Sequence, residues 1–113
     1  MAEQRPSEQI VEEVTSWRGV EAGPGSRGEF GFKVGPREIG HLHGDRAAHF
    51  VFPRTMWAEL LKQGRIVPHP VFPDREGPAA RGIEDEADIR DVIALLRLNY
   101  DRVVTRHGIP VAG

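Results

Sequence analysis

Histidine is the residue type in this chain with the widest chemical scope. The 113 residues contain five histidines and no cysteine, and His41, His43, His49 and His69 fall in or beside segments that should form strands. An imidazole can exchange a proton near neutral pH or bind a transition metal. Disulfides, thiolate nucleophiles and Cys-ligated zinc or iron–sulfur sites are excluded by composition. Histidine chemistry is therefore the first functional hypothesis.

His41 and His43 form the closest pair, within Gly40-His41-Leu42-His43-Gly44-Asp45. Residues two apart in a strand point to the same face, so the two imidazoles should stand side by side. With His69, on the stiff segment Pro68-His69-Pro70, they match a divalent metal site with open positions for water or substrate. Without metal, one histidine would be a general base. We therefore predict His41, His43 and His69 as site residues, and His41 and His43 as metal ligands.

A purely structural role is the competing interpretation of these histidines. A half-buried imidazole often only hydrogen-bonds a backbone carbonyl. His49 and His107 are predicted to be surface residues, and His107 also suits the negative end of the last helix. Asp45 and Arg46 either orient a histidine or form a surface ion pair. The acidic cluster at 84–88 is better explained by helix capping than by calcium binding.

The turn at Gly35-Pro36 decides which sheet face carries His41 and His43. A two-residue loop would pair Phe30 with His41 and turn both histidines to the core. A three-residue loop would pair Phe30 with Leu42 and turn them outward, because a slip of one residue exchanges the faces. Proline cannot adopt the positive φ that two-residue loops use. We therefore predict the longer loop and outward-facing histidines.

The elements that must position these residues indicate an α+β fold. Apolar residues recur at helical spacing over 7–18, 53–64 and 85–107. Strands are predicted over 30–34, 38–43, 49–52, 66–72 and 79–83. Ser7 and Asp85 are the predicted helix caps, the proline-rich 66–72 is an edge strand, and the glycine-rich 22–28 is a loop. The order α-β-β-β-α-β-(β)-α predicts an antiparallel sheet of four to five strands with helices at both termini and one between strands.

Length and charge indicate one small domain over 7–107, with a disordered tail at 1–6 and a C-terminal tail at 108–113. Fifteen Lys and Arg against seventeen Asp and Glu give a net charge of −2 without a basic block, so a nucleic-acid partner is not expected. No apolar segment is long enough to span a bilayer, and the polar start has no signal-peptide character, so no membrane partner and a cytoplasmic location are expected. A small-molecule ligand is the expected partner, and a homo-oligomer stays open.

Taken together, several segments resemble the luciferase-domain family, small bacterial proteins related to fungal luciferases. The resemblance runs from Ile10 to Arg102 and rests on Arg37-Glu38-Ile39-Gly40-His41-Leu42-His43-Gly44-Asp45, Phe52-Pro53, Pro68-His69, Pro73, Asp88-Ile89 and Leu95-Leu96-Arg97-Leu98-Asn99-Tyr100. Fungal luciferase oxidises a hydroxypyrone luciferin with molecular oxygen and no bound flavin. The resemblance thus implies that an enzyme here would be a cofactor-independent or metal-assisted oxidoreductase.

The chain departs from that family pattern beside the predicted site. Pro70 stands where a second histidine is common, and Asp74-Arg75-Glu76-Gly77 replaces a Ser-Gly-Trp type of segment. The element order also looks like that of the MmcQ/YjbR-like proteins, whose fold is similar to frataxin. A cupin is a third interpretation, because Gly35 and His41-x-His43 fit its first motif. Alanines 47 and 48 stand where the metal-binding glutamate of that motif should fall.

Two functions of different classes follow. The first is an uncharacterised luciferase-domain-like protein that binds a small molecule, with oxidoreductase-like chemistry, at a histidine-lined sheet face. The second is a non-catalytic protein-interaction module or a homo-oligomeric structural domain that uses the sheet face or the proline-rich edge strand. A divalent metal is the cofactor the histidines suggest, and the substrate is not specified by any motif.

Overall fold

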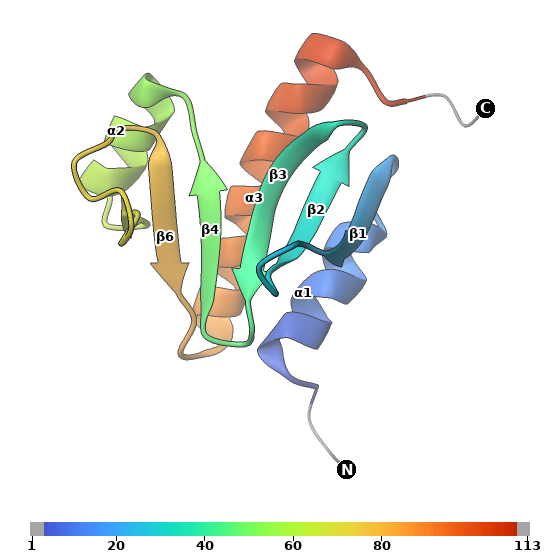
Figure 1. Ribbon diagram of the computed structural model, residues 1–113, viewed down its shortest axis with the longest axis horizontal. Helices are drawn as coiled ribbons and strands as arrows, with labels where there is room; N and C mark the ends of the chain where they lie inside the picture. The colour runs from blue at the N-terminus through green and yellow to red at the C-terminus, as the bar shows by residue number, and fades with distance from the viewer. Residues whose placement is uncertain (1–3, 111–113) are drawn as a thin grey trace.

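Three helices and a six-stranded sheet make up residues 4–110, the part of the chain that the computed structural model describes (Figure 1). The elements are α1 (Pro6–Thr15), β1 (Val20–Pro24), β2 (Phe30–Val34), β3 (Arg37–His43), β4 (Ala47–Val51), α2 (Arg54–Lys62), β5 (Val67–Pro68), β6 (Pro78–Gly82) and α3 (Glu86–His107). The predicted α+β class is confirmed. Residues 1–3 and 111–113, the outer parts of the predicted tails 1–6 and 108–113, lie outside the described residues.

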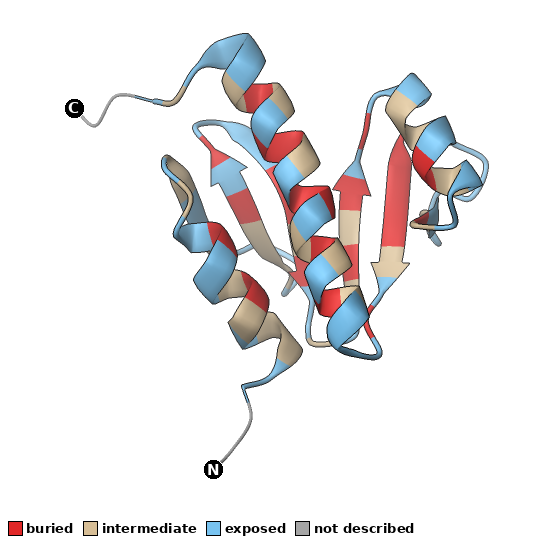
Figure 2. Cartoon of the chain, turned by 180° about the vertical axis from the view of Figure 1, so that it is seen from behind, coloured by how far each residue is buried: buried red, intermediate tan, exposed pale blue. Residues whose placement is uncertain are grey.

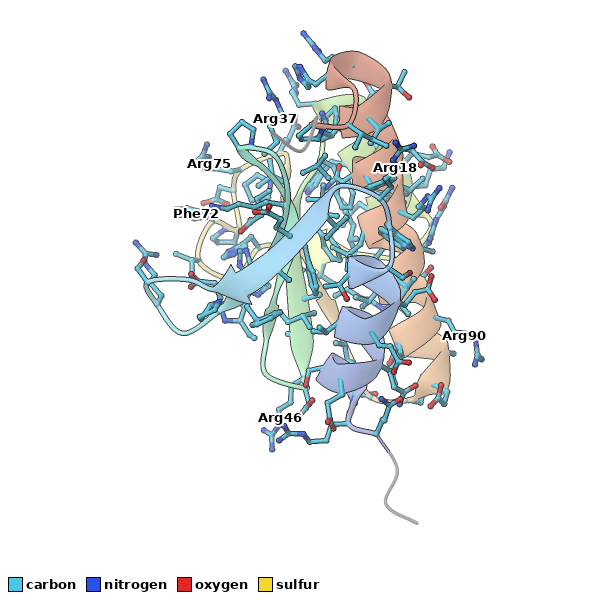
Figure 3. All side chains as sticks on the ribbon, turned by 90° about the vertical axis from the view of Figure 1, so that its right-hand side faces the viewer. Arg18, Arg37, Arg46, Phe72, Arg75 and Arg90 are labelled. Atoms are coloured by element: carbon cyan, nitrogen blue, oxygen red, sulfur yellow. The ribbon has the colours of Figure 1, made fainter. Side chains whose placement is uncertain are left out.

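The strands pair antiparallel in the order β1-β2-β3-β4-β6-β5, and helices α1 and α3 cover one face of this sheet (Figure 2). The core lies between the two layers. Phe32 and Phe50 of the sheet and Ile10 and Leu96 of the helices are each at most 2% exposed. Viewed along the sheet, the two helices lie on one side, and the segment that carries Phe72 lies on the other (Figure 3). The opposite face of the sheet is therefore not covered by these two helices and could hold a site.

The predicted three-residue turn between β2 and β3 is wrong. Val34 is paired with Arg37, so the loop consists of Gly35 and Pro36 alone. Gly35 adopts a φ of 62°, and no residue other than glycine has a positive φ within residues 4–110. In a type II′ hairpin turn, only the first of the two loop residues has a positive φ. Proline is therefore compatible with the second position. Because Gly35 supplies the positive φ, Pro36 does not prevent a two-residue loop.

The predicted register is nevertheless present, because β3 contains one extra residue. Phe30 is paired with Leu42, as expected for outward-facing histidines. Glu38 and Gly40 are paired with consecutive residues of β2, which leaves Ile39 between them without a partner. Such a β-bulge shifts the register by one residue, as a longer loop would have done. The histidines of β3 consequently face away from the core.

Strand β1 is a second correction, because it occupies part of the segment expected to be a loop. Ala22, Gly23 and Pro24 pair with β2 at the edge of the sheet. Pairing with a neighbouring strand outweighs the low strand propensity of glycine and proline, and an edge position spares proline one of its hydrogen bonds. The proline-rich segment forms only the two-residue strand β5, which lies at the opposite edge as predicted.

The helix ends agree with the sequence in α3 and differ from it in α1. Asp85 caps α3 by accepting a hydrogen bond from the backbone N of Asp88 at 2.9 Å. Ser7 does not cap α1, which begins at Pro6. The Ser7 backbone N donates instead to Asp45 Oδ1 at 2.9 Å, so Asp45 ties the β3–β4 turn to α1.

None of the helices within residues 4–110 combines the length and apolar character that crossing a membrane requires.

Candidate functional site

The bulge in β3 determines which side chains reach the open face of the sheet. Ile39 and Leu42 are each 1% exposed and face the helices. Glu38, His41 and His43 lie on the opposite face, where all three border a common groove. Residues three apart in a regular strand point to opposite faces. Glu38 and His41 therefore share a face only because Ile39 is inserted between them.

Four histidines gather on this open face. His41 is paired directly with His49 of the neighbouring strand β4, and their ring centroids are 5.3 Å apart. The ring of His43 lies 5.0 Å from that of His41 and 4.2 Å from that of His49. His69 approaches from the far side, 4.3 Å from His49. The structure thus brings the three predicted residues into one cluster and adds a fourth at its centre.

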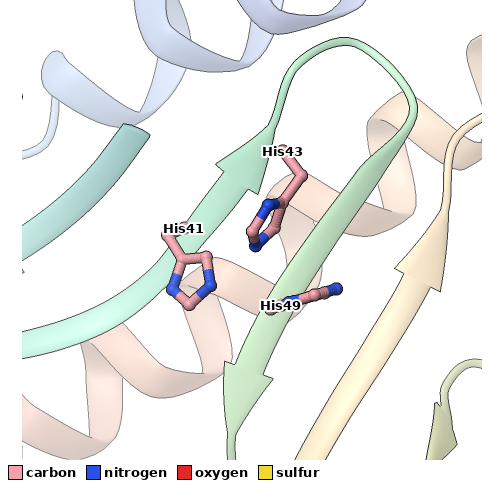
Figure 4. A group of neighbouring side chains, drawn as sticks. All are labelled: His41, His43 and His49. Atoms are coloured by element: carbon pink, nitrogen blue, oxygen red, sulfur yellow. The ribbon is translucent and has the colours of Figure 1, made fainter. Parts of the chain in front are cut away.

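His41, His43 and His49 form the group that could hold a metal ion. One ring nitrogen from each lies within 4.8 Å of the others. Figure 4 shows the three rings on adjacent strands β3 and β4, with His41 and His43 from one strand and His49 from the other. His69 is not part of this group. The group that meets this distance limit therefore contains His49, where the sequence had suggested His69 as the third member.

His49, which was predicted to be a surface residue, lies instead at the centre of the histidine cluster. His49 is half-buried, because His41, His43 and His69 surround its ring. The sequence contained a signal for its orientation. Strand β4 alternates, with Ala48 and Phe50 buried, so His49 must point to the open face. The sequence contained no signal that β4 would pair with β3 in the register that aligns His49 with His41. His107 is exposed, as expected.

Glu38 orients the ring of His41. The Nδ1 atom of His41 lies 3.0 Å from Glu38 Oε2. A carboxylate can only accept a hydrogen bond, so Nδ1 must be the protonated nitrogen of this imidazole. The lone pair of a neutral His41 is therefore on Nε2. Glu38 is a site residue that the sequence analysis missed, because strand alternation without a bulge puts it on the other face.

His69 has the opposite tautomer. The backbone N of Val71 donates to His69 Nδ1 at 3.1 Å, so a neutral His69 carries its proton on Nε2. The backbone N of His69 is bound to Pro78 O at 3.3 Å, which attaches this segment to β6. His69 can thus donate a hydrogen bond from Nε2 but has no free lone pair there. The ring of Phe72 lies 5.3 Å from that of His69.

The histidine cluster borders a groove of about 470 Å³ between two loops. The β1–β2 loop contributes Ser26, Arg27 and Glu29, and the segment after β5 contributes the apolar side chains of Val71 and Phe72. Glu38 and the four histidines form the remainder of the lining. This groove therefore combines polar ring nitrogens, two carboxylates and one guanidinium with a smaller apolar wall, so it is more polar than most small-molecule sites.

Burial and mutual repulsion keep the central imidazoles uncharged. Burial, followed by the neighbouring rings of His43, His69 and His41, lowers the pKa of His49 from 6.5 to about 4. Burial and then the rings of His41 and His43 also lower the pKa of His69. Protonation of one ring would place a positive charge beside the others. His49 and His69 are therefore neutral near pH 7, the form in which an imidazole can bind a metal.

Asn99 of α3 supports the site from the core side. It is 1% exposed, and its Nδ2 donates to Ile39 O at 3.1 Å and to Val51 O at 3.2 Å. Strands β3 and β4 are paired from their connecting turn as far as His41 and His49. The carbonyls of Ile39 and Val51 lie beyond this last pair. A buried carbonyl without a donor costs free energy. The amide of Asn99 thus provides a hydrogen-bond donor for the carbonyl of the bulge residue Ile39 and stabilises the backbone behind His41.

A model of a protein family described as Luciferase domain matches residues 36–99. This segment is more than half of the chain, and it runs from the turn before β3 into α3. It includes Glu38, the four clustered histidines and Asn99. Neither the curated proteins nor the solved structures contain a match to this chain. The matched segment therefore includes Asn99 and all of the groove lining except Ser26, Arg27 and Glu29 of the β1–β2 loop.

Proposed function

Because this chain belongs to the luciferase-domain family, we propose that it binds a small acidic molecule, a phenol or an enol, in the histidine-lined groove and takes up its acidic proton. A planar ligand of this class has an apolar ring and one acidic oxygen. The groove offers a matching apolar wall at Val71 and Phe72 and ring nitrogens along the facing side. Fold and family alone do not establish a function, so the proposal rests on the groove.

The observation that supports this proposal most directly is the hydrogen bond between Glu38 and His41. With Nδ1 donating to the carboxylate at 3.0 Å, the Nε2 lone pair of His41 is available to a ligand. A carboxylate behind an imidazole holds the ring in one tautomer and stabilises the imidazolium that forms when the ring takes a proton. His41 is therefore the proposed general base, and Glu38 is a positioning residue.

His69 and Phe72 are proposed to hold the ligand. The neutral His69 carries its proton on Nε2, so it can donate a hydrogen bond to the oxygen that loses its proton. The ring of Phe72 is 42% exposed and lies beside that of His69, where it can stack on an aromatic ligand. Arg27 lines the same groove and adds a positive charge that favours the bound anion.

The proposed step is a single proton transfer. The hydroxyl of the ligand gives its proton to Nε2 of His41, and the resulting anion accepts a hydrogen bond from His69. Positioned acids and bases of this kind contribute about 100-fold to 10,000-fold to a rate. A deprotonated enol is the electron-rich form that reacts with molecular oxygen, so an oxidoreductase-like reaction would start from the same complex.

Para-nitrophenol tests the proposal, because its anion absorbs visible light and its neutral form does not. At a pH slightly below the pKa of the free phenol, added protein should increase the absorbance of the anion in a saturable way. The double variant His41→Ala, His43→Ala should lose this increase. His107→Ala removes an exposed histidine at the end of α3 and should bind like the unmodified protein. A saturable signal that survives the double variant would refute the assignment to this face.

A second candidate function is a non-catalytic interaction module. Val67, Val71 and Phe72 are 56%, 68% and 42% exposed, and the short strand β5 leaves a sheet edge open. Exposed apolar side chains next to an open edge favour pairing with another chain. Light scattering over a range of protein concentrations distinguishes the candidates. Self-association that Val67→Lys abolishes, with no response of para-nitrophenol, would favour the module.

A further inference from the structure

We propose that His41, His43 and His49 together bind one divalent transition-metal ion, and that His69 stays outside its coordination shell. The inference concerns the same groove and rests on the proposed function only for what the ion would do there. Its first requirement, stoichiometric binding of a metal, is independent of any organic ligand.

The spacing of the three imidazoles is close to that of a metal site. Zinc–imidazole bonds of about 2.0–2.1 Å in tetrahedral geometry place the nitrogens roughly 3.3 Å apart. In the absence of an ion, the candidate nitrogens lie within 4.8 Å of one another. Side-chain rotation alone can make up this difference, because His43 is exposed and His41 is half-buried. The backbone positions already lie on two paired strands, so no change of register is needed.

The hydrogen bonds leave lone pairs on these three rings and not on His69. The Nε2 atom of His41 is free, since its Nδ1 is bound to Glu38. Within residues 4–110, no protein group hydrogen-bonds a ring nitrogen of His43 or His49. His69 differs, because Val71 N occupies the only lone pair of its neutral ring. Three rings that each keep a lone pair, with one nitrogen of each within 4.8 Å of the others, offer a cation a suitable donor set.

Glu38 completes the arrangement from outside the coordination shell. Metal-bound histidines usually donate their second ring N–H to a carboxylate, which orients the ring and increases its basicity. The hydrogen bond from His41 Nδ1 to Glu38 has this geometry. Charge also favours a cation, since Glu29 and Glu38 line the groove against the single guanidinium of Arg27. A bound divalent ion would add its positive charge to that of Arg27 and so favour an acidic ligand further.

The donor set indicates the class of ion. Three neutral imidazoles without a thiolate or an inner carboxylate suit zinc and its neighbours in the first transition series, not Ca²⁺ or Mg²⁺, which prefer oxygen ligands. Three protein ligands leave a fourth position open toward the groove. With Nε2 of His41 bound to the ion, that ring would no longer act as the base, and the hydroxyl proton of the ligand would pass to solvent. The oxygen of the resulting phenolate or enolate would occupy the open position on the ion.

Metal titration of the chain, purified without a polyhistidine tag and treated with chelator, tests the inference. Zn²⁺ affinity is measured by competition with a coloured chelator. Co²⁺ then serves as the spectroscopic probe, because the intensity of its visible absorption distinguishes four-coordinate from six-coordinate sites. We expect one Zn²⁺ per chain and an intense Co²⁺ spectrum. Absence of stoichiometric Zn²⁺ at micromolar concentrations, or a weak six-coordinate spectrum, would overturn the inference.

Variants identify the ligands. Removing a first ligand should weaken Zn²⁺ binding by about 100-fold or more, and Glu38→Gln by about 10-fold to 100-fold. His43→Ala is the safest ligand variant for folding, because its ring is exposed, and His49→Ala is the decisive one. His69→Ala tests whether His69 stays outside the coordination shell, and His107→Ala is the matched control. Both should bind Zn²⁺ as the unmodified protein does. Equal losses in His69→Ala and His43→Ala would show that His69 is a ligand and would refute the proposed set.

Para-nitrophenol binding with and without Zn²⁺ separates this inference from the proposed function. If Zn²⁺ binds at one equivalent and the phenol does not respond, the metal site stands and the ligand class is wrong. If chelated protein binds the phenol and no Zn²⁺ binds, the proposed function stands and the metal site is wrong. If both hold, Zn²⁺ should tighten phenolate binding, and removal of the ion with chelator should reverse this gain.

Discussion

Glu38 and His41 lie on the same face of strand β3 although two residues separate them, and their side chains are joined by a hydrogen bond of 3.0 Å. This relationship exists because Ile39 is inserted into the strand without a partner in β2. An insertion that moves one carboxylate from the core face to the open face changes an isolated histidine into a histidine–carboxylate pair. Bulges recur beside functional sites for this reason.

Gly40→Ala should destabilise the protein by about 1–3 kcal/mol, because the site for an added methyl group is already filled. A Cβ at this position would lie 2.5 Å from Leu96 Cδ2 and 3.1 Å from Phe50 Cδ1, both in the core. Chemical denaturation measures the change. Gly82→Ala is the matched control in β6, where an added Cβ meets no atom within 4 Å, and it should be neutral or slightly stabilising. Equal stability of the two variants would contradict the packing argument.

Asn99→Asp should destabilise the fold by about 2–3 kcal/mol, although the two side chains have nearly the same shape. The substitution replaces the donor group that faces the carbonyl oxygens of Ile39 and Val51 with an acceptor, inside the core. Urea denaturation measures the loss. Asp101→Asn is the reverse exchange on an exposed position of the same helix, where it removes an ion pair with Arg97 and should cost only about 0.3–0.5 kcal/mol. A tolerated Asn99→Asp would show that the two carbonyls find other donors.

The stability of the chelated protein should fall as the pH decreases from about 6.5 toward about 4. The pKa of His49 is lowered to about 4 in the folded protein, by burial and by the rings of His43, His69 and His41, and returns to its ordinary value on unfolding. Between these pH values the unfolded chain binds more protons, so protonation favours unfolding. The loss should be on the order of 1 kcal/mol between about pH 7 and pH 5, after allowance for solvent screening.

Thermal unfolding in chelator at several pH values measures this dependence. His49→Gln should flatten the decrease, with a remainder from His69, whose pKa is also lowered. His107→Gln, at the exposed end of α3, should keep most of the slope. An unchanged slope in His49→Gln would mean that the central imidazole keeps an ordinary pKa in the folded protein.

Phe72→Ala should weaken para-nitrophenol binding without affecting folding. Phe72 is 42% exposed and is not part of the hydrophobic core, so its truncation should leave the core packing intact. Stacking of two aromatic rings contributes about 1 kcal/mol, which corresponds to roughly a fivefold loss of affinity. Absorbance titration measures the affinity, and Phe72→Leu should fall between the two because it keeps apolar contact without a ring. An affinity equal to that of the unmodified protein would place the ligand away from this wall.

Much of the fold could be predicted from local sequence, because periodicity reports which face of an element is buried. The long α3, with Asp85 as its cap, follows from apolar spacing and a capping side chain. The expectation that His41 and His43 share a face follows from the alternation of β3. That this face is the open one was expected from a longer turn, and it is the bulge at Ile39 that produces it. Strand β1 escaped prediction because its glycine and proline indicate a loop, and only pairing with β2 makes it a strand.

What the sequence determined by itself is the chemistry of the site: several imidazoles, no thiol, and a pair of histidines two apart on one strand. Only the tertiary structure decided which residues complete the pair. His49 lies opposite His41 because β4 pairs with β3 in one particular register, and Glu38 joins them because Ile39 is accommodated as a bulge. Both outcomes depend on how separate strands align, and side-chain alternation within a strand carries no information about its partner's register.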